Sequence, residues 1–301
     1  MSVTSERTGA AVLMLVLCTI FWGSNLVVGR AVYEDIPPVG LSFWRNVVAL
    51  LVMLPFTARA VVTQWPVIWR HAGLMFAAGA IGTGLFNVLM YAALETTTAI
   101  NAALLVALCP VMIPVMAYFI LGERLSRRLA LGIAISLVGV AMIITQGELA
   151  VLRSLSFRPG DLLMVVTMLC WSLYSVLVKK KPPALDPYTF LTAILIFAVP
   201  MLLPFYIWES MAGQVMPTTW EAVAASVYTG AFPTALALLF YNRAVMVLGA
   251  NRVGPYNNLV PVFATMMAIL FLGEPLEIHH IVGAVVIAVA LYIATASPKP
   301  R

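Results

Sequence analysis

Tryptophan, tyrosine and asparagine residues recur at helical spacing inside the apolar stretches of this 301-residue chain. Asn87 and Tyr91 are four residues apart and Trp22 and Asn25 are three apart, so each pair lies on one side of a helix. Such side chains give a pocket an apolar body with a few hydrogen-bonding tips, which suits a small ligand. The alternative is a structural role in interfacial belts or in bonds between helices. The residues predicted to line a ligand cavity are Trp22, Asn25, Asn87, Tyr91, Trp171 and Tyr241.

Motifs typical of enzymes and metal sites are missing from the sequence. There is no HExxH or GxSxG motif and no pair of carboxylates inside an apolar run. The cysteines Cys18, Cys109 and Cys170 form no CxxC or Cys/His pattern, and His279 and His280 have no partner at metal-ligand spacing. The sequence therefore predicts a protein that is not an enzyme and that uses no metal or cofactor.

The composition indicates a polytopic membrane protein. Hydrophobic residues make up 62% of the chain and charged residues 10%, with a mean hydropathy of +1.01. A soluble domain is nearer to half apolar and a quarter charged, because it must cover its surface with polar groups. The net charge of +5 comes from scattered basic residues without a basic face, so nucleic-acid binding is not expected.

Ten apolar runs have the length of a membrane-crossing helix. They cover residues 10–32, 39–58, 71–93, 98–121, 128–145, 161–179, 187–208, 220–244, 252–272 and 278–296. Most of the Lys and Arg residues fall in alternate links between these runs. The positive-inside rule then predicts a multi-pass protein of the bacterial inner (plasma) membrane with both termini in the cytoplasm.

Two stretches repeat the same pattern in the two halves of the chain. "LCPVMIPVMAYFILGERLS" begins at Leu108, and "LVPVFATMMAILFLGEPLE" begins at Leu259. We predict an all-α protein in two repeats, residues 1–147 and 148–301, with five spans each. Five is an odd number, so the second repeat is inverted relative to the first. Inverted halves around a central cavity favour transport by alternating access.

Prolines occupy early positions of the corresponding fourth and ninth spans. The four residues are Pro110, Pro114, Pro255 and Pro261. Interrupted helices at matching places of two halves indicate a binding or gating site. Proline is also tolerated in membrane helices for packing alone, so both interpretations stay open.

The sequence resembles the EamA family of the drug/metabolite transporter superfamily over essentially its whole length. The resemblance is carried by "FWGSNLVVGR" in the first run, by "LGERL" and "LGEPL", and by the glycine after each of these. Within the family the chain is most similar to YddG-type exporters of aromatic and other neutral amino acids. This resemblance implies a basket of ten helices around a central cavity, with substrate moving from the cytoplasm to the periplasm.

Ionisable residues inside the spans restrict the substrate and the driving force. Arg45 is the only basic residue well inside a run, where it either extends to the membrane interface or neutralises a carboxylate. Acidic residues lie at the span ends, namely Glu95, Glu123, Asp161 and Glu274. Without a deep carboxylate, facilitated or gradient-driven movement is favoured over strict proton antiport.

The function predicted from these features is export of small neutral metabolites, with amino acids as the small-molecule partners and the lipid bilayer as surroundings. A multidrug transporter would need a buried carboxylate or a fuller aromatic cage. A carrier of nucleotide sugars or phosphorylated metabolites would need clustered basic residues, and only Arg45 is available. An intramembrane enzyme is the third alternative. A monomer is compatible with the sequence.

Overall fold

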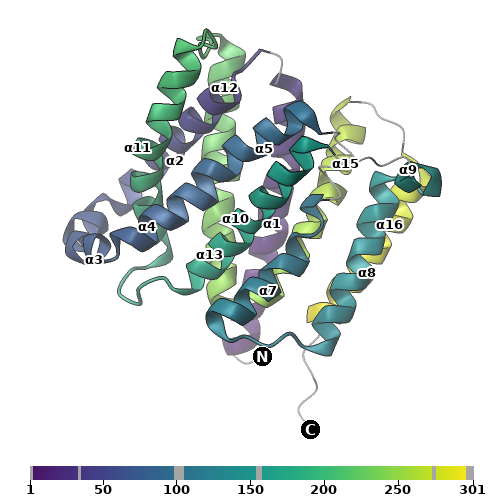
Figure 1. Ribbon diagram of the computed structural model, residues 1–301. Coiled ribbons are helices and arrows are strands. Elements are labelled where there is room, and N and C mark those ends of the chain that lie inside the picture. Colours follow the sequence, from purple (N-terminus) through teal and green to yellow (C-terminus); the bar gives the residue numbers. More distant parts are fainter. Residues whose placement is uncertain (1–2, 33–34, 98–104, 154–157, 273–275, 296–301) are drawn as a thin grey trace.

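Helices make up all the regular structure in the computed structural model, which describes residues 3–32, 35–97, 105–153, 158–272 and 276–295 (Figure 1). The α-helices are α1 (Val3–Val32), α2 (Pro38–Thr63), α3 (Trp65–Arg70), α4 (Ala72–Gly79), α5 (Leu85–Thr96), α7 (Cys109–Leu121), α8 (Arg127–Ile144), α9 (Leu149–Arg153), α10 (Pro159–Lys179), α11 (Pro187–Met211), α12 (Trp220–Thr229), α13 (Ala237–Leu248), α14 (Ala250–Val253), α15 (Leu259–Leu272) and α16 (Ile278–Thr295). Three short segments connect some of them, the π-helices η1 (Ala80–Gly84) and η2 (Gly230–Leu236) and the 3-10 helix η3 (Gly254–Asn258).

The lengths of these helices fit a bilayer. Within the described ranges, eight helical segments are long and apolar enough to cross a membrane. Two further apolar helices, Cys109–Leu121 and Ile278–Ala294, are shorter. The first of these lies in the predicted span 98–121, of which residues 98–104 are outside the described ranges. The part of the protein that the structure describes is therefore all-α, with eight candidate spans and two shorter apolar helices.

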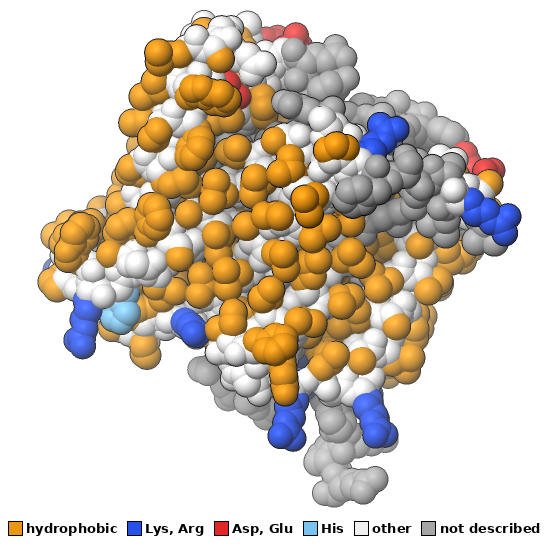
Figure 2. Space-filling view, in the orientation of Figure 1, with side chains coloured by type: hydrophobic (Ala, Val, Ile, Leu, Met, Phe, Trp, Pro, Cys, Tyr) orange, Lys and Arg blue, Asp and Glu red, His pale blue; other side chains and the backbone are white. Residues whose placement is uncertain are grey.

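Large apolar side chains cover much of the outer surface (Figure 2). Phe56 is 81% exposed, and Phe119 and Phe271 are each 76% exposed. A water-soluble monomer rarely exposes apolar side chains over so large an area. The surface is instead suited to contact with lipid tails, as the composition predicts.

Local sequence signals set where several helices begin and end. Pro38 occupies the first turn of α2, where its missing N–H costs no helical hydrogen bond. Ser126 accepts a hydrogen bond from the backbone N–H of Leu129 and so caps α8. Gly122 has a φ of 69°, a left-handed conformation that favours glycine, and it ends α7. The glycine of the "LGERL" stretch is thus a helix stop.

The π-helices interrupt two spans at corresponding places. The stretch "GAIGTG" from Gly79 contains η1, and the stretch "GAFPTA" from Gly230 covers all of η2 except its last residue, Leu236. A Cβ atom added at Gly79 would lie 2.7 Å from the carbonyl oxygen of Ile194 in α11. One added at Gly230 would lie 2.7 Å from the carbonyl oxygen of Arg45 in α2. Both glycines therefore permit a close helix approach that no larger residue would allow.

The helices pair in a pattern that relates the two parts of the chain. Helix α2 packs against α11, and α8 packs against α16 (Figure 1). Helix α1 contacts α13 and α15, while α10 contacts α5 and α7. These two contacts of α1 with the later part therefore have counterparts between α10 and the earlier part. Helices α1 and α10 lie at the centre of this arrangement.

The predicted boundary between the repeats, after residue 147, falls in a turn between α8 and α9. Gln146 and Gly147 have φ values of 57° and 76° in this turn. Glycine adopts such values at little cost, whereas glutamine rarely adopts them. The turn separates α8 from the short helix α9.

Candidate functional site

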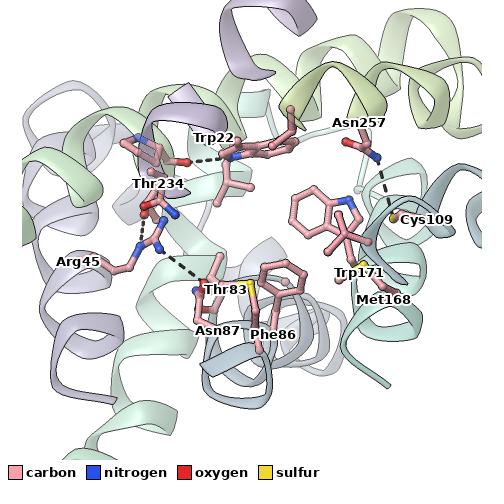
Figure 3. A pocket seen from close by; sticks show the side chains of 17 residues that line it. Trp22, Arg45, Thr83, Phe86, Asn87, Cys109, Met168, Trp171, Thr234 and Asn257 are labelled. Atoms are coloured by element: carbon pink, nitrogen blue, oxygen red, sulfur yellow. Dashed lines mark hydrogen bonds between the residues drawn. The ribbon is translucent and has the colours of Figure 1, made fainter. Parts of the chain in front are cut away.

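A cavity of about 140 Å³ lies among helices from both parts of the chain (Figure 3). Its walls come from α1, α2, η1 and α5, and from α7, α10, η2, α13, η3 and α15. Most of the lining is apolar, with polar side chains at a few points. In Figure 3, Arg45, Thr234 and Asn87 lie at one end, Asn257 and Cys109 lie at the other, and aromatic rings lie between them.

The structure brings four of the six predicted cavity residues together. Trp22, Asn25, Asn87 and Trp171 all line the cavity. Tyr241 is fully buried behind it, with its ring 5.3 Å from Trp22 and 5.1 Å from Trp171. The side chain of Tyr91 lies outside the described part of the structure. Tyr241 therefore supports the lining residues and is not among them.

An aromatic cluster forms the middle of the cavity wall. The rings of Trp22 and Trp171 are 5.0 Å apart and nearly perpendicular, and Phe86 lies 5.2 Å from Trp171. An edge-to-face arrangement is favoured because it brings the positive ring edge to the negative ring face. The indole N–H of Trp22 donates to the carbonyl oxygen of Pro233 in η2 at 3.1 Å, which fixes the orientation of this ring.

Arg45 lies in the cavity wall and is only 5% exposed. Its Nε donates to Thr234 Oγ1 at 2.8 Å, and its Nη1 lies 3.5 Å from Asn87 Oδ1. The two interpretations left open by the sequence were extension to the membrane interface and neutralisation of a carboxylate. The first is wrong, because α2 turns this side chain towards the cavity between η2 and α5.

The π-helices contribute polar lining residues that sequence reasoning missed. When "GAIGTG" is aligned with "GAFPTA", Gly82 matches Pro233 and Thr83 matches Thr234, and all four residues line the cavity. Pro233 has no N–H to donate to the carbonyl oxygen of Thr229, and the hydroxyl of Thr234 donates to it instead at 2.8 Å. Gly-Ala and a threonine recur at the same places in the two stretches, and this repeat was the sequence signal that could have identified the lining threonines.

The prolines predicted to act as hinges lie in elements that contribute to the cavity wall, but none of the four is among the lining residues. Pro110 and Pro114 are in α7, Pro255 is in η3 and Pro261 is in α15. A turn at residues 107–108 precedes α7, and η3 precedes α15, so both helices are interrupted near these prolines. The two interruptions also meet, because a Cβ atom added at Gly254 would lie 3.6 Å from the Cα of Pro110.

The end of the cavity opposite Arg45 is formed near these interruptions. Asn257 lies in η3, and its Nδ2 is 4.0 Å from the sulfur of Cys109 at the start of α7. Cys109 also lies 3.8 Å from the hydroxyl of Ser172 in α10. Asn257 was missed because its match in the first repeat, Val106, is apolar and gives no paired signal.

Comparison with known proteins gives consistent results. The EamA-like transporter family matches residues 9–145 and again 158–296. The "Uncharacterized transporter YyaM" of Bacillus subtilis is 27% identical over 94% of this chain and 92% of its own. The "Probable amino-acid metabolite efflux pump" of Salmonella typhimurium is 25% identical over 96% of this chain and 95% of its own.

The fold is also found among solved structures. One crystal structure superposes on this chain with a TM-score of 0.75 and 19% sequence identity. The superposition covers 95% of this chain and 96% of the chain in that structure. At that identity the likeness concerns the fold alone. The two family matches together extend over most of the sequence, and the helices have the apolar surface of membrane spans. The chain therefore belongs to the EamA-like transporter family, within the drug/metabolite transporter superfamily, and is a multi-pass membrane transporter.

Proposed function

We propose that this transporter exports small neutral metabolites, amino acids and aromatic amino acids among them, by alternating access. The observation that carries the proposal is the Trp22–Trp171 pair. The two indoles come from α1 and α10, at matching places in the two repeats, and they meet at 5.0 Å inside the cavity. A site shared by two halves changes shape when the halves move against each other, which is the basis of alternating access.

The inverted repeat is part of this proposal. Its support is the family match to residues 9–145 and 158–296, together with the paired contacts of α1 and α10. The matching π-helices add to this support. In this arrangement residues 1–147 and 148–301 each form five spans, ten in all, and the prolines beside η3 and α7 permit gating movements.

The size and lining of the cavity favour amino acids over larger substrates. Its volume of about 140 Å³ is close to that of an apolar cavity known to hold benzene, about 150 Å³. An aromatic side chain therefore fits beside Trp22, Trp171 and Phe86. The similarity to the Salmonella protein named as a probable amino-acid metabolite efflux pump supports the same class, and a YddG-type specificity is its finer form.

Export requires a defined orientation, and we propose that both termini are cytoplasmic in an inner membrane. Most of the Lys and Arg side chains visible in Figure 2 lie along the lower rim of the molecule, on the side where α1 begins (Figure 1), and others lie at the upper right. Basic residues collect on the cytoplasmic side of membrane proteins. Substrate would then enter from this side and leave at the opposite one.

Uptake into proteoliposomes tests the proposed function. Labelled phenylalanine, tryptophan, methionine and threonine are offered with and without an imposed proton gradient, and protein-free liposomes serve as control. We expect saturable uptake with mutual competition and little response to the gradient, because no acidic side chain of the described residues lines the cavity. Uptake equal to that of protein-free liposomes for all four amino acids would refute the proposal.

A further inference from the structure

The polar end of the cavity is built around one permanent positive charge. The guanidinium group of Arg45 is charged at all physiological pH values, and it lies inside the wall of a largely apolar cavity. Two of its hydrogen bonds go to the neutral side chains Thr234 and Asn87. A charge at low dielectric interacts more strongly with a ligand group of opposite sign than it would in water.

The neighbouring residues hold the guanidinium plane in a fixed orientation. Thr234 donates its own proton to the carbonyl oxygen of Thr229 and therefore accepts from Arg45 Nε, at 2.8 Å in each case. Asn87 is fixed in a similar way, because its Nδ2 donates to the carbonyl oxygen of Thr83 at 2.9 Å. Thr234 lies in η2, and Thr83, which holds Asn87 of α5, lies in η1, so both π-helices help to position the guanidinium group.

The contact between Arg45 and Asn87 is the weak point of this network. Its length of 3.5 Å is beyond the usual range for an N–H···O hydrogen bond. An anionic oxygen placed at this end of the cavity would make a shorter, charge-assisted bond with Nη1. Arginine is well suited to this, because its planar fork matches the two oxygens of a carboxylate.

From this geometry we infer that Arg45 binds the carboxylate of the substrate, and that the transported compounds are carboxylates with an apolar body about the size of one aromatic ring. The inference rests on the proposed function and specifies its substrate class. The apolar body lies against Trp22, Trp171 and Phe86, which adjoin the polar end in Figure 3. The carboxylate is the group that the site requires, and an ammonium group is not.

Competition among phenylalanine analogues tests this in the wild-type protein. We expect 3-phenylpropionate, which keeps the carboxylate and lacks the ammonium group, to compete with labelled phenylalanine in proteoliposomes. Phenethylamine and phenylalaninamide lack the carboxylate, and their half-inhibitory concentrations should be about 10- to 100-fold higher. Equal competition by 3-phenylpropionate and by the two compounds without a carboxylate would overturn the inference while leaving amino-acid transport intact.

Variants of Arg45 test whether this residue causes the preference for compounds with a carboxylate. Arg45→Gln should raise the half-saturating phenylalanine concentration by about 10- to 100-fold and abolish the preference for acids over amides. Arg45→Lys should fall between it and the wild type, because it keeps the charge and loses the fork. The matched control is Arg59→Gln, since Arg59 is on the same helix and is exposed. An unchanged acid preference in folded Arg45→Gln protein would overturn the inference.

A binding measurement separates this inference from the proposed function. Thermal unfolding of the detergent-purified wild-type protein is followed with 3-phenylpropionate or with 3-phenylpropanamide as the probe. Stabilisation by the acid alone supports a carboxylate site even if no amino acid is transported, in which case only the proposed function fails. Equal stabilisation by both probes, or stabilisation by neither, would contradict the role of Arg45. The measurement uses only the wild-type protein, so it does not depend on whether a variant folds.

Discussion

Trp171 connects the aromatic side chains of the cavity. Its ring contacts Trp22, Phe86, Tyr174 and Tyr241 at centroid distances of 5.0–5.3 Å. It is 7% exposed and lines the cavity, so one part of the ring packs in the core while another is available to a ligand. An apolar ligand would gain much of its binding free energy from a wall of this kind.

Replacing Trp171 by alanine is expected to raise the half-saturating substrate concentration by on the order of 10-fold, because the substrate loses an aromatic contact. Trp171→Phe keeps a ring and should have a smaller effect. Proteoliposome uptake, normalised to folded protein in the membrane, measures both variants. Trp208→Ala is the matched control, since Trp208 is 71% exposed on α11. Unchanged half-saturation in folded Trp171→Ala protein would remove this residue from the site.

At the residue level, the sequence indicated the aromatic part of the site better than its polar part. Trp22 and Trp171 were recognisable because tryptophan at matching places of a repeat is unusual, and the structure places both in the cavity wall. The position of Arg45 depends on which way α2 is rotated, and this follows from the close contact between α2 and Gly230 in η2. Such a contact forms only in the folded protein, so the sequence left two interpretations open.

Helices α8 and α16 pack through small residues. A Cβ atom added at Gly139 would lie 2.9 Å from the carbonyl oxygen of Gly283, and one at Gly283 would lie 2.8 Å from that of Gly139. Small residues allow membrane helices to approach closely enough for extensive van der Waals contact. No residue of α8 or α16 is among the described residues that line the cavity.

Gly139→Ala should therefore destabilise the protein by about 1–3 kcal/mol without changing its substrate preference, because the added methyl group overpacks this contact. Gly73→Ala is the matched control, since Gly73 is also helical and a Cβ atom there would meet nothing within 4 Å. This control should be neutral, or more stable by up to about 1 kcal/mol, because alanine favours helix over glycine. Thermal unfolding in detergent compares the two variants, and equal stability would show that the α8–α16 contact tolerates the methyl group.

At the level of elements, the sequence predicted apolar helices and several of their ends, but not their local geometry. Apolar runs and residues such as Gly122 and Ser126 act through neighbouring backbone, so they can be read from the sequence. A π-helix depends on a small difference between two hydrogen-bonding patterns and on what packs against it. The segments η1 and η2 therefore became visible only in the structure.

The whole molecule combines these features into a cavity enclosed by both parts of the chain. Helices α1 and α10 each contact several helices from the other part, and each contributes one indole to the cavity. If the two parts move against each other, the cavity should open first to one side of the membrane and then to the other. The repeat in the sequence predicts that the two halves are inverted, because each half has an odd number of predicted spans.

Accessibility of the cavity from the two sides of the membrane tests this account most directly. A single cysteine is introduced as Asn25→Cys, with Cys18, Cys109 and Cys170 replaced by alanine, and it is labelled with a membrane-impermeant maleimide from either side. Arg59→Cys, at an exposed position near the predicted cytoplasmic end of α2, is the control and should be labelled from one side only. We expect labelling of Asn25→Cys from both sides, with protection by phenylalanine. Labelling from one side only, or no protection by phenylalanine at saturating concentration, would contradict alternating access to a shared substrate cavity.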